Sequence, residues 1–144
     1  AYGWTFALIG QIVKKGKAKG IIIGGNLSTF LLLLGTAYLP DLRNKILFIE
    51  EDPEINRGMI ERMFTQFSQS DYFNKINGLV IGRFSSKTNF SEKEEKKLFQ
   101  TITLGLDIPV ISNLDFGHTS PIITFPIGGK CEIDTSKNLI KLGY

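Results

Sequence analysis

Short runs of β-branched and aliphatic residues alternate with helical segments along most of this chain. The runs cover residues 20–25, 45–51, 77–84 and 108–113, and glycine, proline, asparagine or acidic residues bound them. Such bounded runs are typical of buried strands. Strands that alternate with amphipathic helices build layers in which the helices cover the sheet. The pattern therefore predicts an α/β fold with a layered sheet.

Three segments between these runs have the spacing of helices. Asn26 is placed to cap the first, which we expect over residues 26–36 with Gly35 at its end. The third opens with Ser91 and Glu94 at the spacing of a capping box. We therefore expect about three helices. The apolar residues of the second recur on one helical face: Ile55, Met59, Ile60, Met63, Phe64 and Phe67.

The last part of the chain lacks a helical pattern. We expect short strands within residues 121–129, 130–134 and 138–144, with residues 134–138 as a hairpin connection. No internal repeat, low-complexity segment or long linker interrupts the sequence. We therefore expect one domain over residues 1–144.

The composition is that of a globular chain, with 42% hydrophobic and 22% charged residues. The net charge is +3, and the basic residues are dispersed apart from a cluster of lysines at positions 14, 15, 17 and 19. This cluster lacks interleaved aromatic residues, so we expect a solvated turn and no nucleic-acid partner. The longest apolar run, residues 30–34, is far shorter than the roughly 20 residues that cross a bilayer, so no membrane partner is expected.

The candidate reactive residues follow the predicted strands. In α/β sheets, functional groups gather beyond the carboxyl ends of the strands. Here these positions hold Asn26, Glu50 and His118, which is the one histidine of the chain. A carboxylate that accepts the imidazole N–H fixes the tautomer and leaves the other nitrogen free to take a proton from a nucleophile. We therefore expect Glu50 to contact His118, with Glu51 on the opposite side of its strand.

Other kinds of chemistry have less support. One histidine and one cysteine form no zinc pattern, and both common nucleotide-binding glycine spacings are absent, so no metal or cofactor is expected. A nucleophilic pair of Cys131 and His118 is an alternative, although a small buried cysteine at the start of a strand is the commoner case. No serine lies in a GxSxG turn, so this chain shows no nucleophile for Glu50 and His118.

The chain contains five collinear stretches from about Lys17 onward: GIIIGGNLSTFLLLLGTAYLPDL, KILFIEED, IERMFTQF, INGLVIGRF and IPVISNLDFGHTSPIITFPIGG. Together they resemble the C-terminal domain of the serine LD-carboxypeptidase family, which includes muramoyl-tetrapeptide carboxypeptidases and microcin C immunity proteins. The resemblance implies a swivelling β/β/α-type domain. By motif, the family's catalytic glutamate falls on Glu50 and its histidine on His118, and Asn26 matches a position near the substrate.

The resemblance also implies a partner domain. Members of this family carry the nucleophilic serine on an N-terminal domain, and its motif has no counterpart here. We therefore expect this chain to be a fragment of a two-domain bacterial hydrolase, inactive when isolated and cytoplasmic in its parent. We also expect an exposed apolar patch near Asn26, Glu50 and His118 that favours a homodimer.

Two substrates and one non-enzymatic role stay open. The first substrate is a murein peptide, cleaved at its terminal L,D-peptide bond during peptidoglycan recycling. The second is the amide of a peptidyl or aminoacyl nucleotide, and the threonine after His118 resembles that immunity branch slightly more. The alternative is a non-catalytic binding or dimerisation module that kept the fold. The presence of both Glu50 and His118 weighs against it.

Overall fold

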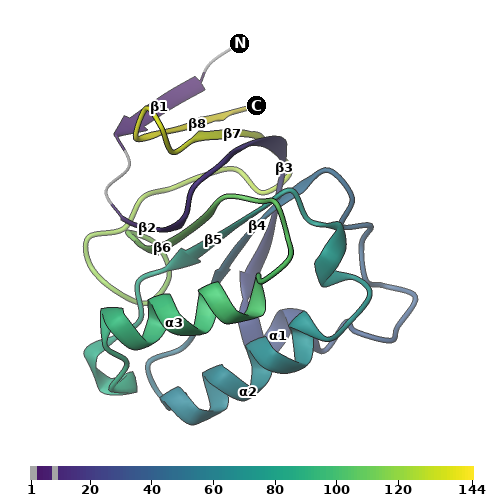
Figure 1. Ribbon diagram of the computed structural model, residues 1–144, viewed down its shortest axis with the longest axis vertical. Helices are drawn as coiled ribbons and strands as arrows, with labels where there is room; N and C mark the ends of the chain where they lie inside the picture. Colours follow the sequence, from purple (N-terminus) through teal and green to yellow (C-terminus); the bar gives the residue numbers. More distant parts are fainter. Residues whose placement is uncertain (1–2, 8–9) are drawn as a thin grey trace.

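The computed structural model describes residues 3–7 and 10–144, which form one mixed sheet with helices on one side (Figure 1). The strands are β1 (Gly3–Ala7), β2 (Gln11–Lys14), β3 (Lys17–Asn26), β4 (Lys45–Glu50), β5 (Gly78–Gly82), β6 (Val110–Leu114), β7 (Lys130–Asp134) and β8 (Leu139–Gly143). The helices are α1 (Leu27–Leu31), α2 (Arg57–Ser68) and α3 (Glu92–Ile102), with short 3-10 turns η1 (Phe73–Lys75) and η2 (Ser86–Thr88). This arrangement confirms the predicted α/β class, the layered sheet and the expected number of helices.

The strand order β1-β8-β7-β3-β4-β5-β6-β2 places four parallel strands, β3 to β6, at the centre. The outer strands pair antiparallel on both sides of them. β1 ends at Ala7 and β2 begins at Gln11, although these two strands are the outermost ones. Four residues of extended chain span at most about 14 Å. The sheet therefore curls until its two edges lie near each other.

Side chains alternate between the two faces of the central strands, so the sheet has two hydrophobic cores. On the helix-covered face, α1, α2 and α3 pack on strand residues that include Leu47, Ile49, Leu79 and Ile81. We call the opposite side the curl face. Its core includes Ile22, Ile46, Phe48, Val80, Ile111, Phe116, Cys131, Ile133, Ile140 and Leu142.

The helices begin where local capping chemistry places them. Asn26, Asn56 and Ser91 each accept a hydrogen bond from the backbone N–H three residues later. The carboxylate of Glu94 accepts a hydrogen bond from the backbone N–H of Ser91, so the predicted capping box is present. The cap at Asn26 also fixes the point where β3 turns into α1.

The first helix is shorter than predicted. α1 ends at Leu31, and the N–H groups from Leu32 to Leu34 each donate to the carbonyl three residues back. Leu32 is 77% exposed. A run of consecutive leucines cannot place every side chain on one buried helical face, so the segment tightens into turns before Gly35.

The expected strand within residues 121–129 is also wrong, because this segment has no regular structure. Pro121 and Pro126 lack the N–H that a strand ladder requires. The segment instead closes the curl face, where Phe125 packs on Phe48 with ring centroids 4.7 Å apart. The strands at 130–134 and 139–143 and the hairpin between them agree with the prediction.

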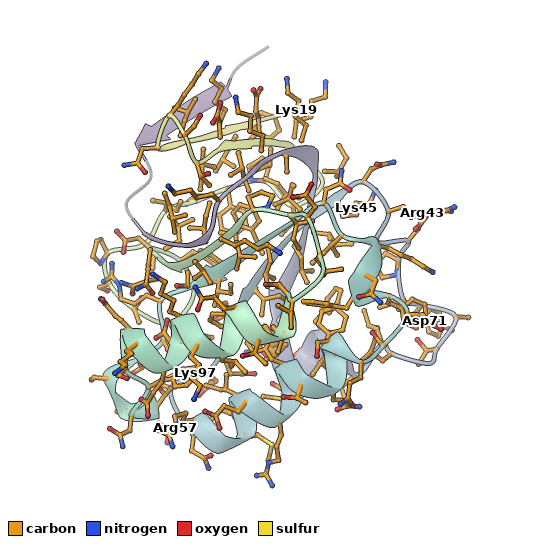
Figure 2. All side chains as sticks on the ribbon, viewed as in Figure 1. Lys19, Arg43, Lys45, Arg57, Asp71 and Lys97 are labelled. Carbon is orange, nitrogen blue, oxygen red and sulfur yellow. The ribbon has the colours of Figure 1, made fainter. Side chains whose placement is uncertain are left out.

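The lysine cluster is only in part the solvated turn that the sequence predicts. Lys17 and Lys19 are largely exposed, but they lie in β3. Lys14 lies in β2, and its ammonium donates to the backbone carbonyls of Thr103 and Leu106. The charged side chains labelled in Figure 2 project from different sides of the molecule, so charge is dispersed. Within residues 3–7 and 10–144, no helix is long and apolar enough to cross a membrane.

Candidate active site

The carboxyl ends of the parallel strands bring Asn26, Glu50 and His118 to one edge of the sheet. Asn26 and Glu50 are paired at the ends of β3 and β4, and His118 follows the end of β6 by four residues. The Nδ1 atom of His118 lies 2.6 Å from Oε2 of Glu50. This contact confirms the predicted meeting of imidazole and carboxylate.

Two glycines allow the loop that carries His118 to reach Glu50. β5 lies between β4 and β6, so the loop must cross the end of β5. A Cβ atom on Gly82 would lie 2.6 Å from the carbonyl oxygen of Phe116 and 2.9 Å from Cβ of Glu50. Gly117 has a φ of +97°, and a Cβ there would lie 2.7 Å from Oε2 of Glu50. A side chain at either position would therefore disturb the loop or the carboxylate.

An irregularity in β6 directs this loop. Ile111 pairs with Val80 and Leu114 with Gly82, so β6 has one residue more than β5 between these pairs. Asn113 lies in this interval in the left-handed conformation, with a φ of +58°. An extra residue of this kind bends a strand and increases its twist. The bend directs the chain toward the end of β5.

Arg83 holds the same loop from the end of β5. Its guanidinium forms an ion pair with the carboxylate of Asp115 and donates a hydrogen bond of 3.4 Å to the carbonyl of Ser120. Its backbone N–H donates to the carbonyl of Leu114 at 2.8 Å. Asp115 and Ser120 lie on either side of His118 in the sequence. Arg83 therefore anchors both arms of the segment that presents the imidazole.

The surroundings of His118 favour its protonated form. The hydrogen bond to Glu50 and the charge of Glu50 are the main causes that raise the pKa of His118, and the charges of Asp52 and Glu51 add to them. Burial acts in the opposite direction, less than Glu50 but more than Asp52 or Glu51, and the imidazole remains about half exposed. With Nδ1 bound to Glu50, Nε2 is the nitrogen left to exchange protons with a nucleophile.

Glu51 faces the other side of the strand, as predicted. Its carboxylate accepts hydrogen bonds from the backbone N–H of Ser28 at 2.9 Å, the backbone N–H of Asp52 at 2.8 Å and the amide of Asn26 at 2.8 Å. The N–H groups in the first turn of a helix have no partner within the helix. Glu51 therefore joins the end of β4 to the start of α1.

Asn26 lies beside His118, but much of its side chain is already bonded. Its Oδ1 accepts from the N–H of Thr29 at 3.1 Å and from the hydroxyl of Ser28 at 2.8 Å. Its Nδ2 donates to Glu51, which leaves one amide hydrogen for a ligand. Its role near the substrate remains a prediction. An open hollow of about 530 Å³ is lined by Asn26, Ser28, Thr29, Asp52, Glu54, Ile55 and His118.

A second hollow of about 360 Å³ extends from Glu50 over the curl face. Its lining includes Phe116, Phe125, Ile122 and Ile127. The last two side chains are 62% and 59% exposed. This surface agrees with the exposed apolar patch that the sequence predicts beside the candidate pair.

Cys131 does not belong to this site. It pairs with Gly20 near the start of β3, whereas Asn26 marks the far end of that strand. Burial, and to a lesser extent the charge of Glu132, raise the pKa of the Cys131 thiol to about 12. The alternative pairing of Cys131 with His118 is therefore wrong. In the described part of the chain, no group of three histidine, cysteine or carboxylate side chains is placed to hold a metal ion.

Arg83 and Asp52 are parts of the site that the sequence pattern does not single out. Both residues follow the carboxyl ends of strands, which is the signal that identifies Glu50. An acidic residue after a strand is usually solvated, so the position of Asp52 alone is not specific. The ion pair of Arg83 with Asp115 depends on the bend in β6, which no local sequence pattern predicts.

Comparison with known proteins relates this chain to one family. The family model described as LD-carboxypeptidase C-terminal domain matches residues 19–133. The protein YocD of Bacillus subtilis is 40% identical over 123 residues, which are 85% of this chain and 38% of YocD. MccF, the microcin C7 self-immunity protein of Escherichia coli, is 30% identical over 126 residues, covering 86% of this chain and 37% of MccF.

Solved structures agree with the sequence relatives. An MccF-like protein from Bacillus anthracis superimposes with a TM-score of 0.82 at 37% identity, covering 91% of this chain and 41% of that one. MccF in complex with glutamyl sulfamoyl guanosine has a TM-score of 0.80 at 28% identity, with 95% of this chain and 41% of that chain covered. This chain thus spans about two fifths of the length of the proteins that it matches.

Proposed function

The chain belongs to the LD-carboxypeptidase C-terminal domain family, and from this premise we propose that it supplies the glutamate and the histidine of a Ser–His–Glu triad. The observation that carries the proposal is the 2.6 Å contact between Glu50 and His118 at the carboxyl edge of the parallel strands. In this proposal His118 is the general base and Glu50 is the carboxylate that orients it.

The proposed reaction uses the two ring nitrogens in different ways. Glu50 holds the Nδ1–H, so the lone pair of Nε2 takes the proton of a serine hydroxyl as its oxygen attacks the substrate carbonyl. Glu50 then stabilises the imidazolium. Nε2 returns the proton to the leaving amine as the C–N bond breaks, and a water molecule repeats the sequence on the acyl-enzyme.

We propose that the serine lies on an N-terminal domain of a longer protein. The share of YocD and MccF that this chain matches leaves room for such a domain. Ser28 lines the hollow with His118, but its hydroxyl lies within hydrogen-bonding distance of Asn26 and Glu51. The isolated chain is therefore expected to be inactive. The apolar hollow with Ile122 and Ile127 is the proposed contact for a second domain or a second copy in a homodimer.

Two substrates fit this proposal. One is a murein peptide with a terminal L,D-peptide bond, in keeping with the family's description. The other is the amide of an aminoacyl or peptidyl nucleotide, a class represented by the glutamyl sulfamoyl guanosine bound to MccF. Both offer a carbonyl to a serine, and with either substrate we propose that the intact enzyme acts in the bacterial cytoplasm.

The test is an assay of the intact protein on a murein tetrapeptide and on a peptidyl-nucleotide amide. His118→Ala and Glu50→Ala should each lower kcat/KM by about a thousandfold or more, because triad members act as a unit. Glu50→Gln should be milder than His118→Ala, since an amide still orients the ring. Lys97→Ala, on the exposed side of α3, is the control that should retain full turnover.

Near-normal turnover by His118→Ala would contradict the triad. No turnover by the unmodified intact protein on either substrate would favour the non-catalytic module. Turnover by the isolated chain that depends on His118 would place the nucleophile in this chain.

A further inference from the structure

A second carboxylate lies near the ring nitrogen of His118 that Glu50 does not contact. The Oδ2 atom of Asp52 is 3.9 Å from Nε2, while Oε2 of Glu50 is 2.6 Å from Nδ1. A separation of 3.9 Å is too long for a hydrogen bond and within the range of an ion pair. The imidazole is therefore placed between two carboxylates, one at each ring nitrogen.

Local hydrogen bonds hold Asp52 in this position. Its Oδ1 accepts the backbone N–H of Glu54 at 2.8 Å, and its carbonyl accepts the N–H of Ile55 at 3.1 Å. Its own N–H donates to the buried Glu51 at 2.8 Å. These bonds occupy one carboxylate oxygen and leave Oδ2 toward the ring. Asp52 thus contacts the imidazole from a fixed turn, although its side chain is 44% exposed.

We propose that Asp52 is a positioning residue for His118, acting through the second ring nitrogen, and that it adds to the effect of Glu50 in raising the pH above which Nε2 becomes available as a base. A general base must be unprotonated to accept a proton. A carboxylate beside Nε2 favours the protonated ring, so proton release is shifted to higher pH. The catalytic consequence rests on the proposed function, whereas the contact itself does not.

The other charged groups near the ring do not replace this contact. Glu50 binds the opposite nitrogen, and Glu51 is directed toward α1. Glu54 lines the same hollow, where its carboxylate lies 3.3 Å from the ammonium of Lys87. On the loop that carries His118, Asp115 is paired with Arg83. Asp52 is therefore the carboxylate that the structure places beside Nε2.

The single histidine makes the contact measurable without turnover. An NMR titration of this chain follows one imidazole, so no assignment of competing signals is needed. Asp52→Asn keeps an oxygen for the N–H of Glu54 and removes the charge. We expect it to lower the pKa of His118 by about half a pH unit, the size typical of a half-exposed ion pair.

The matched control is Glu54→Gln, which removes the same charge from the same hollow without a contact to the ring. We expect its shift to be less than half of that caused by Asp52→Asn. If Asp52→Asn loses the folded circular dichroism spectrum, Asp52→Ser supplies a second variant, because a hydroxyl can also accept the N–H of Glu54. Equal shifts in the Asp52 and Glu54 variants, or no downward shift for Asp52, would overturn the proposal.

A kinetic measurement separates this inference from the proposed function. In the intact protein, Asp52→Asn should move the acidic limb of the kcat/KM profile to lower pH by the shift seen in the titration. An NMR shift without a corresponding kinetic shift would show that His118 is not the base and would overturn the proposed control of catalysis by Asp52. If neither shift is seen, the proposed role of Asp52 is overturned. The triad itself is tested separately, by the turnover of His118→Ala.

Discussion

The two faces of the central sheet use neighbouring glutamates for different purposes. Glu50 points to the curl face and Glu51 to the helix-covered face, and both are buried, with 8% and 2% exposure. Glu51 accepts hydrogen bonds from Asn26 and Ser28 at the start of α1 and from the N–H of Asp52, whereas Glu50 contacts an imidazole that is half open to solvent. Strand alternation thus separates a carboxylate that stabilises the fold from one that is available for chemistry.

The faces also differ in how they are closed. On the helix-covered face, three helices pack over the central strands, and aromatic rings such as Phe64 and Phe99 meet at 5.0 Å. On the curl face, the loop after β6 covers the core incompletely and leaves Ile122 and Ile127 exposed next to Glu50. The open face is therefore the one that a substrate or a second domain can approach.

The strongest test of the comparison replaces each glutamate in turn. Glu51→Ala should lower the free energy of unfolding by about 3 kcal/mol, because three partly buried donors lose a charged acceptor that is itself buried. Glu50→Ala should cost less than about 1 kcal/mol, since water can solvate the half-exposed ring of His118. Denaturant unfolding of the isolated chain measures both. A larger loss of unfolding free energy for Glu50→Ala than for Glu51→Ala would contradict the view that Glu51 is the carboxylate that stabilises the fold.

The helix-covered face also holds Glu95 on α3, a buried carboxylate that, unlike Glu51, is not fully hydrogen-bonded. It is 4% exposed, its Oε2 has no hydrogen-bond partner, and burial followed by the charge of Glu92 raises its pKa to about 7. Because the folded pKa exceeds the unfolded value, the stability from this group is present below about pH 4.5 and is lost as pH rises through 7. Glu95 should therefore destabilise the fold by up to about 3 kcal/mol at pH 8.

Glu95→Leu should recover most of this loss at pH 8 and less of it at pH 5. Thermal or urea unfolding at the two pH values gives the difference. Glu92→Leu makes the same change on the exposed side of α3 and should give a much smaller gain. An equal gain at both pH values would mean that Glu95 is not protonated by burial.

A third test removes the space that Gly117 leaves for Glu50. Gly117→Ala should cost about 2 kcal/mol, because a Cβ would approach Oε2 of Glu50 at 2.7 Å and the φ is positive. It should also weaken the contact with His118 and lower the pKa of the imidazole. Gly105→Ala is the matched control, with a φ of +85° and no atom within 4 Å of the added Cβ. The control should lose about 1 kcal/mol and leave the pKa of His118 unchanged.

The smallest effect concerns the charge of Glu50 itself. Its contact raises the pKa of His118, so the stability from the pair is present below the unfolded histidine pKa and is lost as pH rises through the folded one. Exposure of the ring limits this contribution to about 1 kcal/mol or less. Glu50→Gln should lower the pKa measured by NMR and flatten the pH dependence of stability above pH 6. An unchanged pKa of His118 in Glu50→Gln would show that the charge of Glu50 does not affect the imidazole.

The sequence supported much of the fold and the central pair of the site. The four central strands, the caps at Asn26 and Ser91 and the contact between Glu50 and His118 agree with predictions from local pattern and from the family resemblance. The length of α1 and the strand expected within residues 121–129 were wrong. Both errors arose where short apolar runs are compatible with more than one backbone conformation, and packing decides among these.

The sequence by itself determined which residues are able to form strands and caps, because these properties depend on a few neighbouring residues. The pairing of Glu50 with His118, which are far apart in the chain, was predicted from their positions after strands and from the family resemblance. Only the tertiary structure decided that β5 lies between β4 and β6. The loop with His118 therefore crosses the end of β5, and positions 82 and 117 have no space for a side chain. The tertiary structure also placed Asp52 beside Nε2. These arrangements depend on strand order and on contacts between distant segments, which the packing of two cores sets and no local spacing encodes.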